Sequence, residues 1–246
     1  MASQPSVITP GDDAQALLMQ GTLDVEGLVP WGSNYTFLVT IRDGARATLA
    51  IYKPSRGERP LWDFPTGTLA NREVAAYRVS QALGWPNIPP TILREGPEGL
   101  GMVQLFVELV DGQHFFTLRD AHRAEMQRIA VFDAIINNTD RKGGHVLLGE
   151  NGAIWCIDHG VTFHERYKLR TVIWDFTRQP IPAQLIADMG TLRSHLTRGD
   201  AVFDSLRELL SPREIRALRS RLDELIERGT FPEPPEDWPP VPWPPL

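Results

Sequence analysis

The sequence contains a single cysteine, Cys156, and this scarcity excludes two kinds of scaffold. One thiol cannot form a disulfide within the chain, and it cannot build a cysteine-rich zinc site. Long apolar stretches are also missing, because nowhere do about 18 apolar residues run uninterrupted, as a membrane-spanning helix requires. The first residues lack the basic and apolar regions of a signal peptide. We therefore expect a cytoplasmic protein without integral membrane association.

An excess of positive charge is absent as well. The chain has 25 Lys and Arg residues against 31 Asp and Glu residues, which gives a formal net charge of -6. Binding to nucleic acid by general neutralisation of phosphates needs the opposite balance, so no nucleic-acid partner is expected. With 246 residues, of which 42% are hydrophobic, the chain can bury one large core or two small lobes.

The first half of the chain has the texture of a β-sheet. Short runs that alternate in polarity or are rich in β-branched residues predict an antiparallel meander of three strands, over residues 17–28, 35–44 and 45–54. Apolar residues then recur at helical spacing over 68–85, where Gly84 marks the expected end. A further hairpin is predicted over 92–109 because Gly96, Pro97 and Gly99 favour a turn.

The second half is expected to be mostly helical. Residues 118–138 have apolar residues at helical intervals and then become almost continuously apolar, which is typical of a buried helix. Residues 145–158 predict a hairpin that turns at 150–152. Three more helices are expected, over 181–196, 200–210 and 212–228. The last is marked by a capping box of Ser211 and Glu214, with Gly229 just past its end.

These patterns divide the chain into four parts, with no internal repeat. Residues 1–13 are polar and are interpreted as a flexible arm. A β-rich N-lobe with one main helix is expected over 14–108, and a mostly helical C-lobe over 109–228. The tail, 229–246, is rich in proline and tryptophan and cannot be a regular helix or a central strand. The expected fold class is therefore α+β.

Two carboxylates in the second half attract attention. Asp140 follows the buried helix, and the predicted hairpin returns the chain to Asp158, so both should lie near the same end of that hairpin. Two converging acids can bind a divalent cation, or one can bind metal while the other positions a hydroxyl nucleophile. Phosphoryl transfer requires that division of roles.

The stretches "NNTDRKGGHVLL" and "CIDHG" resemble the catalytic loop and metal-binding segment of the phosphatidylinositol 3- and 4-kinase superfamily, including HipA-type kinases. More narrowly, residues 15–228 resemble an actinobacterial family described as phosphatidylinositol 3- and 4-kinase-like. The resemblance implies a bilobal, protein-kinase-like fold in which Asp140 orients the acceptor and Asp158 and His145 bind metal. Those kinases usually have asparagine where this chain has His145, and imidazole suits softer ions than Mg²⁺. Asn138 is expected to brace the loop.

The N-lobe contains residues in the order typical of kinases. Lys53 ends the third strand of the meander and Glu73 lies early in the following helix, so an ion pair between them can hold the lysine against the phosphates of ATP. A turn with small or polar residues precedes the second strand and resembles a phosphate-covering loop; its candidate residues are Gly32, Ser33 and Asn34. By position, Gln104 to Val107 would be the hinge that binds adenine.

The function expected from these residues is a phosphotransferase that uses ATP with Mg²⁺ or Mn²⁺. The acceptor is unknown, and a protein or small molecule is at least as compatible as a lipid. Two alternatives stay open: a pseudokinase that binds nucleotide as a regulatory module, which His145 favours, and a nucleotidyl transferase. The oligomeric state is not predicted.

Each motif by itself also has an ordinary structural interpretation. Asp140 with its neighbour Arg141 can be a loop salt bridge, and His145 can be a hydrogen-bonded core histidine. The basic residues Arg166, Lys168 and Arg170 can bind an anionic substrate or form a solvated edge. The aromatic residues Trp62, Phe64, Trp238 and Trp243 favour packing within the chain. The joint order of lysine, glutamate and the two aspartates is what favours ATP chemistry.

Overall fold

The computed structural model describes residues 12–29, 34–85 and 88–246 of the chain. Its contacts divide the chain into two compact units. Unit 1 consists of Pro89–Glu108 and the described part of Met1–Tyr77. Unit 2 consists of Leu109–Leu246 and the described part of Arg78–Ile88. The expected α+β class is confirmed, because the antiparallel sheet of unit 1 is followed by a largely helical unit 2.

Unit 1 is built on a five-stranded antiparallel sheet with strand order β1-β2-β3-β5-β4. The strands are β1 (Thr22–Leu28), β2 (Phe37–Asp43), β3 (Arg46–Pro54), β4 (Thr91–Gly96) and β5 (Gly99–Leu105). A short 3-10 turn, η1 (Ser55–Gly57), follows β3, and α2 (Leu69–Leu83) ends at Gly84, which has a φ of 62°. The meander, the helix and the second hairpin predicted from the sequence are therefore present.

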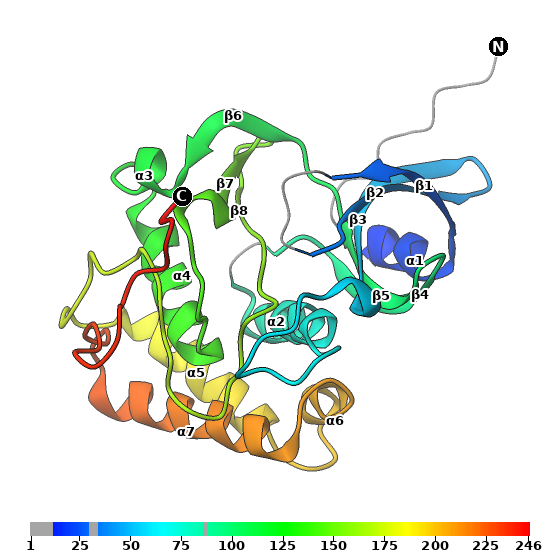
Figure 1. Ribbon diagram of the computed structural model, residues 1–246. Helices are drawn as coiled ribbons and strands as arrows, with labels where there is room; N and C mark the ends of the chain where they lie inside the picture. Colours follow the sequence, from blue (N-terminus) through cyan, green and yellow to red (C-terminus); the bar gives the residue numbers. More distant parts are fainter. Residues whose placement is uncertain (1–11, 30–33, 86–87) are drawn as a thin grey trace. The chain divides into compact units, whose positions relative to one another are not determined.

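The start of the predicted meander is wrong, because its first residues form a helix, α1 (Asp12–Gln20). Ala14, Leu17 and Leu18 recur at helical spacing and are fully buried against one face of the sheet. Figure 1 shows α1 lying within the curve of these strands. The apolar run is too short for its period to distinguish a helix from a strand. The expected flexible arm also loses its last residues to α1, and residues 1–11 lie outside the described part.

Unit 2 combines a small sheet with several helices (Figure 1). Its antiparallel strands are β6 (Leu109–His114), β7 (Val146–Gly149) and β8 (Ile154–Cys156), in that spatial order. The helices are α3 (Phe115–Leu118), α4 (Arg123–Ile136), α5 (Ala183–His195), α6 (Ala201–Arg207) and α7 (Pro212–Arg228), with a 3-10 turn η2 (Gly143–His145). The sequence predicts the β7–β8 hairpin and four of these helices, but it gives no signal for β6 as a partner of β7 or for α3.

The long helix α4 is the centre of unit 2. Every residue from Ile129 to Ile136 is buried, as the nearly continuous apolar sequence predicts. The exception in character is Asp133, the only charged residue in this run, whose carboxylate is fully buried. The amphipathic helix α7 contacts α4 and α5, and it begins at the predicted capping box and ends at Gly229, which has a φ of 64°. No helix in the described ranges combines the length and apolar character needed to cross a bilayer.

Candidate functional site

In unit 1 the sheet and α2 bring Lys53 and Glu73 together. The Lys53 ammonium lies 2.9 Å from Glu73 Oε1. The Glu73 side chain is only 3% exposed, whereas that of Lys53 is 23% exposed. A carboxylate buried this deeply requires a cation or several hydrogen bonds, so the pair fixes the position of the lysine while leaving it accessible from solvent. The ion pair expected from the sequence is present.

The register of the sheet identifies the neighbours of Lys53. Side chains alternate between faces along β3, so Ile51 shares the face of Lys53, while Ala50 and Tyr52 belong to the buried core beside α1. Leu38 of β2 and Gln104 of β5 both lie opposite Ile51. Leu38 and Ile51 were not predicted from the sequence as apolar neighbours on the lysine face. The alternation of β3, counted back from Lys53, would have indicated Ile51.

The proposed hinge residues are only partly available to a ligand. Gln104 is buried, and its side-chain amide donates a 2.8 Å hydrogen bond to Thr91 Oγ1. The N–H groups of Leu105 and Phe106 donate to the carbonyls of Pro90 and Leu49. The backbone of Gln104 also lies within the sheet, opposite Ile51 of β3 and Thr91 of β4. The predicted roles of Gln104 and Val107 toward adenine therefore stay predictions.

The predicted phosphate-covering turn falls largely outside the described residues. Gly32 and Ser33 are among the residues that the structure does not describe. Asn34 is described, and its side-chain oxygen accepts a 2.7 Å hydrogen bond from the N–H of Arg59. Asn34 thus connects the start of β2 to the segment after η1, and its role toward phosphate stays a prediction.

In unit 2 a buried ionic network holds the loop that follows α4. Arg141 and Asp133 are both 0% exposed, and Arg141 Nη2 lies 2.9 Å from Asp133 Oδ1. Burial is the largest single influence and lowers the pKa of Arg141, but the charge of Asp133, its hydrogen bond and the other acidic groups nearby together outweigh burial. The net pKa is therefore raised, and the guanidinium stays charged. The sequence-based alternative of an Asp140–Arg141 bridge is replaced by this pair. The charge at Asp133 inside an apolar helix was the signal for it.

Asn138 also braces the loop that carries Asp140, as expected from the sequence. Its side-chain amide donates to Asp133 Oδ1 at 3.0 Å, and its side-chain oxygen accepts the N–H of Asp140 at 3.0 Å. The loop is also flanked by backbone hydrogen bonds, because the Arg170 N–H donates to the Asn138 carbonyl and the Arg141 N–H donates to the Arg170 carbonyl. Asp140 therefore projects from a rigid backbone.

Asp140 is a partly buried carboxylate with a nearby cation. Its side chain is 35% exposed, and Oδ2 lies 3.5 Å from the ammonium of Lys142. Burial is the main reason that the pKa of Asp140 is raised; the positive charges of Lys142 and Arg170 oppose the rise, and the negative charge of Asp158 adds to it. A carboxylate with a raised pKa is better suited to accept a proton near neutral pH.

Asp158 follows β8 and faces the side chain of His145. The distance from His145 Nε2 to Asp158 Oδ2 is 3.4 Å. Asp158 has a φ of 60°, in the left-handed region that L-residues other than Asn, Asp and Gly adopt at a cost. Aspartate is one of the residue types that tolerate this backbone conformation. The structure thus brings three predicted residues of unit 2, Asp140, His145 and Asp158, into one neighbourhood.

The donor atoms only partly suit a divalent cation. Asp158 is 49% exposed and offers oxygen ligands of the kind that Mg²⁺ and Mn²⁺ prefer. His145 Nδ1 accepts a 3.4 Å hydrogen bond from the Lys142 N–H, so the ring proton is on Nε2, the atom facing Asp158. His145 can become a ligand through Nε2 only when this proton is on Nδ1. No group of three potential metal-binding side chains is found within the described residues.

The only cysteine of the chain lies beside this network but has a structural environment. Cys156 in β8 is fully buried. Burial raises the pKa of its thiol to about 12; the charge of Arg141 opposes the rise, and that of Asp133 adds to it. Such a thiol stays protonated at neutral pH and is a poor nucleophile.

Comparison with solved structures identifies the fold. The chain is similar to the crystal structure of a Helicobacter pylori proinflammatory kinase, CtkA, with a TM-score of 0.53. The similarity covers 87% of this chain and 94% of the kinase chain, at 11% sequence identity. The fold expected from the sequence is therefore confirmed as kinase-like.

Comparison of sequences adds two relatives. No protein-family profile matches the chain. Phosphatidylinositol 4-kinase gamma 4 of Oryza sativa subsp. japonica is 29% identical over 191 residues, covering 68% of this chain but only 34% of the rice protein. Protein Rv2133c of Mycobacterium tuberculosis strain H37Rv is 40% identical over 268 aligned positions, which cover 95% of each chain. By this extended similarity, the chain belongs to the same family as the mycobacterial protein Rv2133c.

Proposed function

We propose that this chain is an ATP-dependent phosphotransferase that transfers the γ-phosphate of ATP to a hydroxyl group. The observation that carries the proposal is the ion pair of Lys53 and the buried Glu73 in a chain with a kinase-like fold. A lysine held in this way is the usual partner of the nucleotide phosphates in kinases. Asp140 and Asp158 of unit 2 supply the acidic groups that the same chemistry needs.

Each residue has one role in this proposal. Lys53 binds the phosphates of ATP, and Glu73 holds its ammonium in place. Asp158 binds a divalent cation, Mg²⁺ or Mn²⁺, with His145 as a further ligand when Nε2 is free of its proton. Such a cation neutralises the negative charge of the phosphate oxygens. Asp140 orients the acceptor hydroxyl and receives its proton.

The transfer balances without any other reactant. The acceptor oxygen forms a bond to the γ-phosphorus, and the bond from that phosphorus to the oxygen bridging the β- and γ-phosphates breaks. ADP leaves with this electron pair, and the hydroxyl proton moves to the carboxylate of Asp140. The raised pKa of Asp140 favours this proton transfer over that to an ordinary aspartate.

The acceptor is an alcohol of a protein, a small molecule or a lipid. The rice relative is named a phosphatidylinositol 4-kinase, which places an inositol hydroxyl among the acceptors to be tested. The Helicobacter pylori structure is described as a kinase, without a named acceptor. A panel for this chain should therefore include phosphatidylinositol vesicles, generic protein substrates and the chain itself.

A pseudokinase is the second candidate, and one observation favours it. His145 Nε2 lies 3.4 Å from Asp158 Oδ2, and its Nδ1 accepts the Lys142 N–H, which favours the ring proton on Nε2. A chain locked in that arrangement would bind nucleotide through Lys53 and lack one of the two expected metal contacts. It would then act as a regulatory module that senses ATP without turnover.

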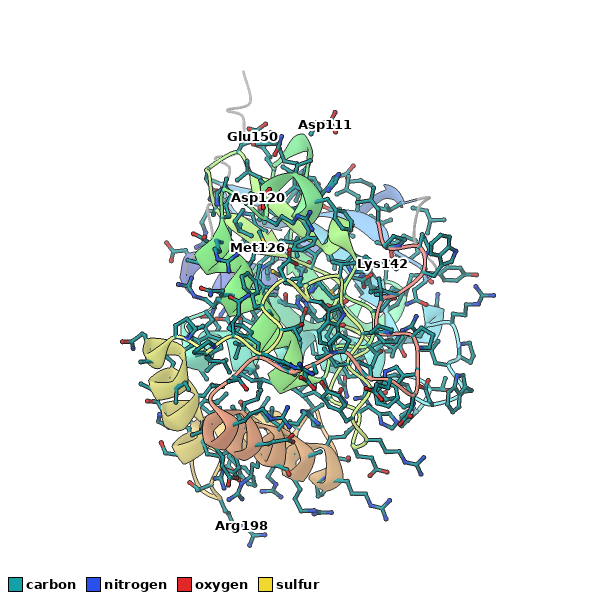
Figure 2. All side chains as sticks on the ribbon, turned by 90° about the vertical axis from the view of Figure 1, so that its left-hand side faces the viewer. Asp111, Asp120, Met126, Lys142, Glu150 and Arg198 are labelled. Atoms are coloured by element: carbon teal, nitrogen blue, oxygen red, sulfur yellow. The ribbon has the colours of Figure 1, made fainter. Side chains whose placement is uncertain are left out.

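Incubation with ATP labelled at the γ or the α position, in the presence of Mg²⁺ or Mn²⁺, separates these functions. A kinase incorporates the γ label, and the incorporation is lost in Asp140→Asn and Asp158→Asn. The matched control is Asp120→Asn, an exposed aspartate of unit 2 that is labelled in Figure 2 and should retain wild-type transfer. Incorporation of the α label would replace the proposal by nucleotidyl transfer. ATP binding without any label transfer would replace it by the pseudokinase.

A further inference from the structure

The proline-rich tail runs back along unit 2 and reaches the loop of Asp140. Figure 1 shows it as the red trace that leaves the end of α7 and ends near α3. We call residues 238–246 the proline strap; they contain five prolines. At the start of the strap, the ring of Trp238 lies 6.1 Å from that of Tyr167.

The strap makes hydrogen bonds to two segments that follow Asp140, one at Gly143 and one at 171–174. The carbonyl of Pro245 accepts the N–H of Gly143 at 2.7 Å. The carbonyl of Pro240 accepts the N–H of Thr171 at 2.9 Å and the indole N–H of Trp174 at 3.2 Å. Lys142, labelled in Figure 2, directly precedes Gly143. The strap thus ties the segment after Asp140 to the segment at 171–174.

Glycine at 143 allows this close approach. A Cβ atom at that position would lie 2.5 Å from the Phe116 ring and 3.4 Å from Leu246 Cδ1. Real Cβ atoms do not approach a ring carbon so closely, so any other residue would displace Phe116 or the loop itself. Phe116 and Leu246 therefore both lie close to the position that a side chain of residue 143 would occupy.

Both anchored residues lead directly to the proposed catalytic groups. Gly143 begins η2, the single turn that ends at His145 and aims its ring toward Asp158. Thr171 forms a parallel bridge with Arg141, and its hydroxyl donates to Asp133 Oδ2 at 3.4 Å. Movement of either anchor would shift His145 or the buried pair behind Asp140.

A proline-rich segment is well suited to fix a neighbouring loop through only a few hydrogen bonds. Proline has a fixed φ and no N–H, so a proline-rich segment loses little entropy when it becomes ordered and offers only carbonyl acceptors. The strap uses exactly such acceptors at Pro240 and Pro245. By contrast, the Trp243 side chain is 86% exposed, so it contributes little to the packing of the strap.

We infer that the proline strap is a positioning element of the active site, which fixes the Asp140 loop and the His145 turn for transfer. This inference rests on the proposed phosphotransferase function. The hydrogen bonds of the strap given above all go to residues of unit 2, whereas Lys53 belongs to unit 1. Loss of the strap should therefore lower kcat and leave the KM for ATP nearly unchanged.

Two truncations and one substitution test the inference. A chain ending at Trp243 lacks the Pro245 acceptor, and a chain ending at Pro239 lacks both acceptors. Misplacement of catalytic groups by about 1 Å costs up to about 100-fold in rate, so we expect kcat for γ-phosphate transfer to fall about 10- to 100-fold. Trp243→Ala is the matched control, because it removes an exposed side chain and keeps the strap backbone.

Hydrogen exchange distinguishes a local effect from general unfolding. The amide of Gly143 should exchange faster in both truncations, and that of Thr171 only in the shorter chain. The amides of Arg141 and Arg170 are internal controls, because their acceptors lie outside the strap. A peptide of residues 236–246 should restore kcat to the truncated chain in a saturable manner.

The outcomes separate the strap from the proposed function. Wild-type kcat per folded molecule in both truncations would overturn the inference. If the intact chain transfers no phosphate from ATP, the phosphotransferase proposal is wrong. The role of the strap is then tested by hydrogen exchange alone. In that case faster exchange confined to Gly143 and Thr171 supports its hold on the loop, and unchanged exchange overturns it.

Discussion

The ammonium of Lys53 is held 2.9 Å from the carboxylate of Glu73, a side chain with almost no exposure to solvent. Lys53→Met leaves this carboxylate without its ammonium partner. Breaking a buried pair from one side costs about 3 to 5 kcal/mol, and because Lys53 keeps some access to water we expect about 3 kcal/mol here. Urea unfolding would measure the loss, and calorimetry should show weakened ATP binding.

The double variant Lys53→Met/Glu73→Gln separates stability from function. It should recover most of the lost stability, because the buried charge is gone, while ATP binding stays weak. The exposed pair of Arg46 and Asp43 is the control, and Arg46→Met should cost about 0 to 1 kcal/mol. Recovery of ATP binding in the double variant would contradict the role of Lys53.

The pH dependence of transfer should follow Asp140. Its pKa is raised, so activity should be lost on acidification at a higher pH than an ordinary aspartate would cause. Lys142 lowers this pKa, so Lys142→Met should move the acid limb of kcat/KM to still higher pH. Arg119→Met, at an exposed ion pair of unit 2, should leave the limb in place. A shift of the limb to lower pH would exclude Asp140 as the group that titrates.

The same raised pKa implies a cost in stability. A carboxyl whose folded-state pKa lies above its unfolded value destabilises the fold when ionised, and the penalty disappears as the pH falls below the unfolded pKa. Asp140→Asn should therefore raise the melting temperature at neutral pH and have little effect in acid. A lower melting temperature at neutral pH would show that Asp140 stabilises the fold.

The buried pair of Arg141 and Asp133 should be a main support of the loop. Arg141→Met leaves Asp133 without its guanidinium in a fully buried position, which costs about 3 to 5 kcal/mol. Urea unfolding would measure this loss, with Arg119→Met as an exposed control worth about 0 to 1 kcal/mol. A similar small loss at Arg141 would mean that the network contributes nothing to the loop.

Two substitutions at Asp158 separate the role of its charge in transfer from the effect of its positive φ on stability. Asn tolerates a positive φ, so Asp158→Asn should remove metal-dependent transfer and keep the stability of the fold. Asp158→Val should be about 1 to 2 kcal/mol less stable as well, because a β-branched residue is strained at this φ. Equal thermal stability of the two variants would contradict the strain.

His145 should control the choice of metal. His145→Asn places an amide oxygen where an imidazole now faces Asp158. Oxygen ligands suit Mg²⁺ better than imidazole does, so the ratio of turnover with Mg²⁺ to turnover with Mn²⁺ should rise. An unchanged ratio, measured at saturating metal, would show that His145 is no ligand.

Much of this arrangement follows from local sequence signals. Lys53 could be assigned to the end of a strand and Glu73 to the start of a helix, because the hydrophobic residues around them recur with the period of a strand and of a helix. Ser211, Glu214 and Gly229 marked both ends of α7, since capping depends on neighbouring residues. Asp140 and Asp158 could be placed near one another because a short hairpin connects them.

The remainder depends on contacts that are distant in sequence. The apolar residues of α1 are buried by strands from elsewhere in the chain, and a short run does not reveal that partner. The partner of Arg141 proved to be Asp133, one turn of helix and a loop away, instead of the adjacent Asp140. The course of the tail toward Gly143 is set by carbonyls of proline, which carry no side-chain signal.

The buried thiol of Cys156 gives this chain an intrinsic reporter. It is the only sulfhydryl present, it lies in β8 two residues before Asp158, and it is sealed from solvent. A thiol-reactive dye can reach it only when the β7–β8 hairpin opens, so the labelling rate counts those openings directly. A ligand that suppresses opening of this hairpin should therefore slow the labelling of Cys156, and no engineered probe is needed to detect it.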